Sequence, residues 1–77
     1  MGSFPTNKEV IKQDIEREKR NIENAKLNIA NLKAAKARES DKSRRANIQT
    51  SIDACKQNIE DCKWRLEKLK EKLKNAK

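Results

Sequence analysis

The sequence predicts an all-α fold, an antiparallel hairpin of two helices that pack as a coiled coil. Apolar residues recur in alternating steps of four and three along both halves of the chain, which is the spacing of a narrow helix–helix seam. No glycine follows Gly2 and no proline follows Pro5, so long uninterrupted helices are allowed elsewhere. A lone hairpin leaves the sides of its seam open, and we therefore expect it to dimerise into a four-helix bundle.

The composition favours a thin helical assembly over a globular domain. Only 34% of the 77 residues are hydrophobic and 42% are charged, which can fill a seam but not a wide core. The regular apolar period argues against a disordered chain, which would show none. We expect a single domain.

Helix one is expected over residues 6–38, after a disordered segment at 1–5 whose first three letters fit either a cloning remnant or a natural terminus. Thr6 and Glu9 form a capping-box pattern at its start. Glu18 and Lys36 fall at seam positions and weaken the stripe. The expected seam residues are Ile11, Ile15, Ile22, Ala25, Ile29 and Leu32.

A turn is expected at residues 39–43, because no apolar residue occurs from Arg38 to Arg45 and the seam register shifts across this stretch. Ser40, Asp41 and Ser43 are weak helix formers that suit caps and turns. Folding here would place Glu18 near Cys62. One continuous helix with a local stutter is the alternative.

Helix two is expected over residues 44–77, with the more regular seam of the two. Its seam residues are Ile48, Ile52, Cys55, Ile59, Cys62, Leu66, Leu69 and Leu73. Seven residues of helix separate the two cysteines by about 10.5 Å along the axis, which is too far for a disulfide between them. With no histidine and no paired-cysteine motif, we expect small seam residues rather than a metal site.

The net charge is +8, and eight lysines occupy heptad position e, four in each helix, where they flank the seam. These lysines are a solvated flank or a surface for polyanions. The C-terminal stretch is the strongest candidate for contact with a partner or a polyanion, through Lys63, Trp64, Arg65, Lys70, Lys72 and Lys77. Leu27, Ala30, Ala34 and Trp64 are candidates for the face added on dimerisation.

The first functional hypothesis is a non-catalytic coiled-coil module for protein–protein interaction and assembly, with itself as a homodimer or with another helical protein. Because the chain is small and lacks chemical motifs, this hypothesis includes an accessory protein of a phage or other mobile element. The alternative is a small basic nucleic-acid-binding protein that uses its lysine-rich edge.

The sequence lacks the residues of most catalytic sites: it has no histidine, no tyrosine, no Gly-rich loop and no serine–base pair. We therefore expect no enzyme activity, cofactor, metal or small-molecule substrate. No apolar run exceeds two residues, so we expect no membrane span or signal-peptide core and a cytoplasmic location.

Overall fold

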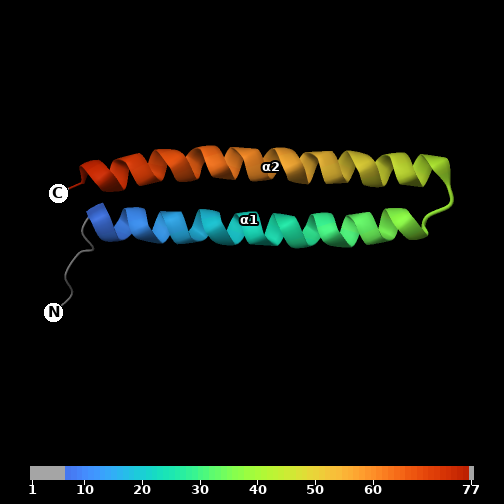
Figure 1. Cartoon of the computed structure of the whole chain (residues 1–77), viewed down its shortest axis with the longest axis horizontal. Coiled ribbons are helices and arrows are strands. Elements are labelled where there is room, and N and C mark those ends of the chain that lie inside the picture. The colour runs from blue at the N-terminus through green and yellow to red at the C-terminus, as the bar shows by residue number, and fades with distance from the viewer. Residues whose placement is uncertain (1–6, 77) are drawn as a thin grey trace.

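The computed structural model describes residues 7–76 and contains two α-helices there, α1 (Asn7–Arg38) and α2 (Lys42–Asn75). The helices lie side by side and run in opposite directions, joined by a short connection at one end (Figure 1). The predicted all-α two-helix hairpin is therefore confirmed, and the alternative of one continuous helix is wrong. The expected terminal segment 1–5, the capping residue Thr6 and Lys77 lie outside the described residues.

The connection between the helices is shorter than the expected turn at 39–43, because α2 begins at Lys42 and not at residue 44. The Asp41 carboxylate is the reason: its Oδ1 accepts hydrogen bonds from the backbone amides of Ser43 at 2.8 Å and Arg44 at 3.2 Å. These amides have no partner within the helix, so an N-cap aspartate stabilises the first turn and draws Ser43 into it. At the other end Ala76 has extended backbone, so α2 stops at Asn75.

The end of α1 is held by a side chain from α2. Arg45 donates from Nη1 to the carbonyl oxygens of Lys36 at 3.3 Å and Glu39 at 3.1 Å. The last carbonyls of a helix lack internal partners, and a cation is favourable beside them. Asp41 and Arg45 therefore close the turn from both sides without a glycine.

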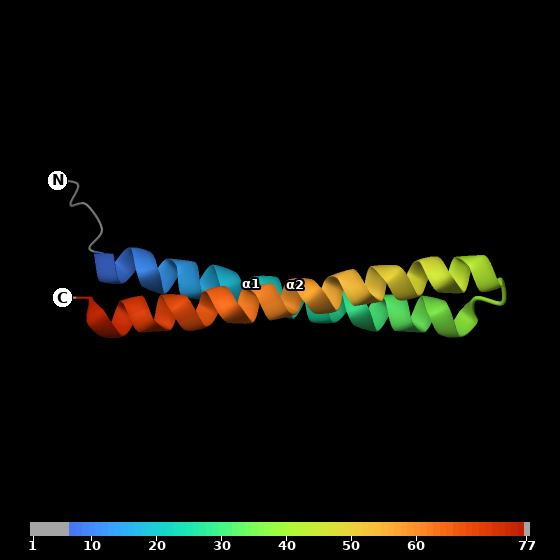
Figure 2. The same ribbon diagram turned by 90° about the horizontal axis from the view of Figure 1, so that it is seen from above.

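The core is one seam between the helices. Its buried residues are Ile15, Ile22 and Ala25 from α1 and Ile52, Ile59 and Cys62 from α2. The helices cross at a shallow angle near the middle of the hairpin (Figure 2), as the 4-3 spacing requires. The molecule extends over 59 × 26 × 13 Å, which is a single layer of helices. Neither described helix is long and apolar enough to cross a membrane.

Candidate interaction surfaces of the hairpin

The seam is only partly covered by the hairpin itself. Besides the six buried residues, the other predicted seam residues are half-buried in the structure. These are Ile11, Ile29, Leu32, Ile48, Cys55, Leu66, Leu69 and Leu73. Ile29 and Leu66 among them pack against the buried cluster. Lys36, the expected weak point near the turn, is also half-buried, and its Nζ donates to Gln49 Oε1 at 2.6 Å. A long, half-exposed apolar stripe therefore runs along the hairpin.

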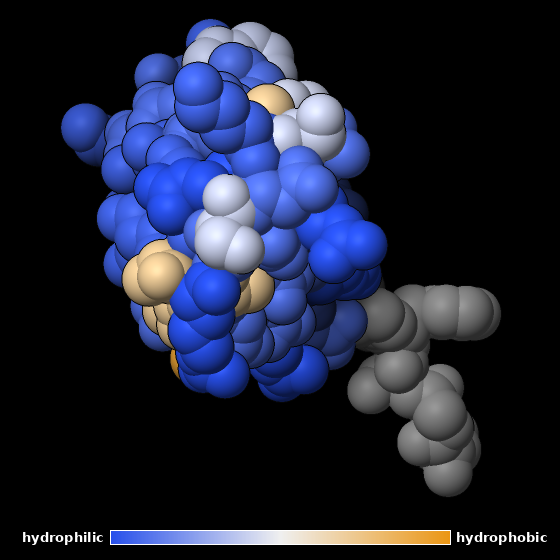
Figure 3. Space-filling model, turned by 90° about the vertical axis from the view of Figure 1, so that its right-hand side faces the viewer, coloured by the Kyte–Doolittle hydropathy of each residue, from blue (hydrophilic) through white to orange (hydrophobic). Residues whose placement is uncertain are grey.

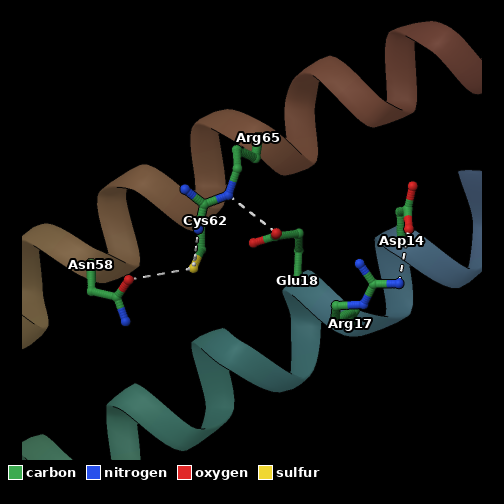
Figure 4. Close-up of polar contacts among 6 residues, drawn as sticks. All are labelled: Asp14, Arg17, Glu18, Asn58, Cys62 and Arg65. Atoms are coloured by element: carbon green, nitrogen blue, oxygen red, sulfur yellow. Dashed lines mark hydrogen bonds and ion pairs between the residues drawn. The ribbon is translucent and has the colours of Figure 1, made fainter.

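A polar cluster interrupts the seam in the half of the hairpin that is open to the termini (Figure 4). Glu18 occupies a seam position in α1, and its Oε1 accepts a hydrogen bond from Arg65 Nε of α2 at 3.1 Å. The Glu18 side chain is 13% exposed and the Arg65 side chain 46%. Arg65 Nη2 also donates to Cys62 Sγ at 3.2 Å, and the thiol lies 3.9 Å from Asn58 Oδ1. The cluster thus links both helices.

The charge of Glu18 is stabilised mainly by Arg65. Burial by itself would raise the pKa of the Glu18 carboxyl, but the hydrogen bond from Arg65, with smaller contributions from Cys62 and Asn21, holds this pKa below its ordinary value. Glu18 Oε2 is buried and has no partner of hydrogen-bonding geometry in the described part of the chain. Arg65 therefore carries most of the stabilisation.

The cysteines are free thiols in seam positions. Burial raises the pKa of the Cys62 thiol, and the nearby Glu18 carboxylate raises it further, so the reactive thiolate is disfavoured. Among residues 7–76, no three cysteine or acidic side chains gather as metal ligands would.

The predicted contact residues of α2 do not form one surface. Trp64, 64% exposed, lines a groove with Arg65 and Lys72, and Lys68 Nζ lies 5.5 Å from its ring centroid. Lys63 lines a separate groove, and Lys70 forms an ion pair with Glu67.

The candidates for a face added on dimerisation are also divided. Leu27 and Trp64, 63% and 64% exposed, both occupy heptad position f, opposite the seam of their own helix. In an antiparallel pair the two f positions point to opposite sides of the molecule. One partner face cannot contain both residues.

The edge formed by the e-position lysines is partly neutralised along its length. Lys26, Lys56 and Lys63 from both helices line one shallow groove. Four lysines of this edge form ion pairs with the glutamate three residues earlier: Lys19–Glu16 at 3.6 Å, Lys26–Glu23 at 3.7 Å, Lys63–Glu60 at 3.7 Å and Lys70–Glu67 at 3.9 Å. Each pair lowers the positive charge offered to a ligand.

A second basic surface lies at the turn end, and the sequence reasoning missed it. Residues 33–45 contain six basic and two acidic residues, a net charge of +4 in thirteen residues. An open groove of about 320 Å³ lies beside the turn, hereafter the turn groove, and it is lined by Lys33, Lys36, Ala37, Arg45, Gln49, Ile52 and Lys56. None of these lining residues is acidic. Seen end-on from the turn, the surface is largely hydrophilic (Figure 3).

A charge count across the turn would have revealed the excess in the sequence, but that stretch was interpreted only as a break between helices. Lys33 and Lys56 are e-position lysines of opposite helices, which the predicted hairpin places along one edge, but only the fold shows that they share a groove with Lys36 and Arg45. Comparison of the chain with models of protein families, with curated proteins and with solved structures finds no match.

Proposed function

We propose that the chain is a non-catalytic assembly module that pairs with a second copy of itself to form a four-helix bundle. The half-buried apolar stripe supports this proposal, because eight seam side chains retain exposed surface that a second hairpin would cover. Burying apolar surface contributes roughly 25 cal/mol per Å², so a stripe this long is a substantial driving force. A single layer of helices leaves this stripe uncovered within one copy.

The charges favour one edge of the hairpin for this contact. Along the edge at position e, lysines of one copy would meet lysines of the other, which is repulsive. The opposite edge, at position g, carries short neutral side chains over its middle: Asn21, Asn28, Ala35, Ser51 and Asn58. Short neutral side chains let a second hairpin approach the seam, and we therefore assign the homodimer contact to the g edge.

The mass of the purified chain in solution tests self-association. Light scattering or sedimentation equilibrium should give twice the monomer mass of 8.9 kDa at micromolar concentration. A mass that stays monomeric as the concentration rises would contradict the proposal.

Two matched double variants then test the edge. Asn28→Lys with Ser51→Lys adds charge at position g, and should give a helical monomer. Asn24→Lys with Thr50→Lys adds the same charge to neighbouring exposed positions outside that edge, and should remain a dimer. Dimers from both variants would show that the hairpin pairs through another face.

The alternative function, nucleic-acid binding through the lysine edge, has less support. Four of its lysines are already paired with glutamates of their own helix, and the expected contact residues are divided between two edges of α2. The assembly module therefore remains the proposal that the geometry favours.

A further inference from the structure

We infer that the turn groove binds phosphate groups of a nucleic-acid backbone. This site takes Lys33 and Lys56 from the e-position edge but none of the four edge lysines that form ion pairs, and it does not depend on self-association. Three observations support it: the charge of the groove is not balanced by acids, its cations are held in place by neutral groups, and its surroundings suit an extended polyanion.

The acidic residues near the turn form no ion pair with a described residue. Every ion pair between described residues lies outside residues 27–59. Within that range Asp41 caps α2, Glu39 Oε1 accepts from the Asp41 amide at 3.1 Å, and Asp53 Oδ1 accepts from Gln49 Nε2 at 2.9 Å. All three carboxylates are thus bonded to neutral donors. The positive charges beside them remain available to a ligand.

The second observation concerns the cations themselves. Lys36 Nζ is held by the Gln49 side chain and Arg45 Nη1 by two backbone carbonyls, all neutral oxygen atoms. These bonds restrict the side chains without removing their charge. Arg45 keeps the N–H groups of Nε and Nη2 for a phosphate, which guanidinium binds in a two-pronged geometry. Lys33 and Lys56 add ammonium groups from opposite helices.

The third observation concerns the surroundings of the groove. Arg38, Lys42 and Arg44 are exposed around the turn and extend the basic surface beyond the groove. A chain of linked phosphates could contact the turn groove and these exposed cations at the same time, whereas a single phosphate ion could not. An anionic membrane is the weaker match, because residues 38–45 include no apolar side chain to insert between lipids.

Recognition at this site should be insensitive to base sequence. The aromatic side chain in the described part of the chain, Trp64, lies in the other half of the hairpin and cannot stack on a base held at the turn. Binding by backbone contacts alone is salt-dependent and typically has a Kd of about 10⁻⁴–10⁻⁶ M at physiological salt. We expect affinities in that range.

The test is binding of fluorescently labelled duplex DNA to the full chain by anisotropy, over a series of salt concentrations. Lys33→Gln with Lys56→Gln removes two groove charges. This variant should weaken binding and lower the slope of log affinity against log salt by about 1.8, or 0.9 for each lost phosphate contact. The matched control, Lys19→Gln with Lys63→Gln, removes two e-position lysines that are in ion pairs, and should change the slope much less.

Several outcomes would overturn the inference. Absence of DNA binding by the unmodified chain at about 50 mM salt would overturn it. Equal slopes of log affinity against log salt for the groove variant and its control would also overturn it, because they would indicate diffuse electrostatic attraction. Binding to vesicles rich in phosphatidylserine but not to DNA would assign the surface to lipid. Lys33→Arg with Lys56→Arg keeps the charge and should bind like the unmodified chain; loss of binding there would contradict an electrostatic site. Light scattering on the same variants separates these results from failure of the dimer.

Discussion

The two halves of the hairpin share one apolar seam but treat their charges differently. The open half, residues 7–26 with 57–76, contains twelve basic and nine acidic residues and all six ion pairs between described residues. The turn half, residues 27–56, contains seven basic and three acidic residues and no ion pair between them. Net charge differs little between the halves, at +3 and +4. The two halves differ in whether their charged side chains form ion pairs.

This difference suggests a division of roles along one fold. Acids placed three residues before lysines stabilise the open half, and Arg65 and Glu18 connect its two helices. In the turn half the acids close the turn and the cations stay unpaired, which favours binding over stability.

The largest effect should come from the shared seam. Ile59→Asp places a carboxylate in the core cluster with Ile22, Ala25 and Cys62, where burying a charge among apolar side chains is costly. Because a domain of this size is stable by only a few kcal/mol, we expect loss of most helicity and of the dimer. Circular dichroism and light scattering measure both. Gln57→Asp makes the same charge change at an exposed position and should keep the fold; an intact Ile59→Asp hairpin would refute this seam.

The next effect belongs to the open half alone. Arg65→Met leaves the Glu18 carboxylate at a seam position without its partner, and should lower the free energy of unfolding by less than Ile59→Asp does, because Arg65 is half exposed and solvent screens the pair. Glu18→Leu continues the apolar stripe and should be neutral or stabilising. Urea unfolding measures both. If Arg65→Met costs as much in the Glu18→Leu background, the loss is one of packing and not of charge pairing.

The comparison also shows what sequence could predict. The 4-3 rhythm is a local pattern that repeats through Ile52, Ile59 and Leu66, so it predicts helices, a seam and an antiparallel pair without knowledge of distances. The first residue of α2 depends on which of several good capping residues serves as the N-cap. Asp41 is the N-cap, not Ser43. Propensity rules do not predict a helix boundary to within one or two residues, so they could not choose between these two caps.

The surfaces were harder to predict than the fold. The predicted fold places Glu18 near Cys62, but heptad letters do not show that Arg65, three residues further along α2, reaches the Glu18 carboxylate. The turn groove likewise depends on the positions of Lys36 and Arg45 beside the edge lysines of the groove, which heptad letters do not supply. The acids three residues before the e-position lysines are visible in sequence, but only contacts show which pairs form: Glu67 pairs with Lys70, whereas Asp53 accepts from Gln49.

A smaller effect should appear with pH. The pKa of Glu18 is lowered in the folded state, so its charge stabilises the hairpin above the ordinary carboxyl pKa, and this contribution is lost as the pH falls through the lowered folded-state value. Glu18→Gln removes this charge, and with it the stabilising contribution, at every pH. Urea unfolding at pH 7 and pH 3 should therefore show a stability difference between the two proteins that shrinks in acid. A difference that stays constant would mean that Glu18 ionisation does not contribute.

The smallest effect contrasts two acids at the same spacing in α2. Glu60 and Asp53 each precede an e-position lysine by three residues, but Glu60 pairs with Lys63 while Asp53 accepts from Gln49. Glu60→Gln should cost about 0.2–0.5 kcal/mol at low salt and almost nothing at high salt, because exposed ion pairs are screened. Asp53→Asn keeps an acceptor for Gln49, so its effect should not depend on salt. Equal salt dependence of the two variants, measured by thermal unfolding, would place Asp53 in an ion pair in solution. The distinction between the halves of the hairpin would then narrow, and with it the unbalanced charge on which the turn groove depends.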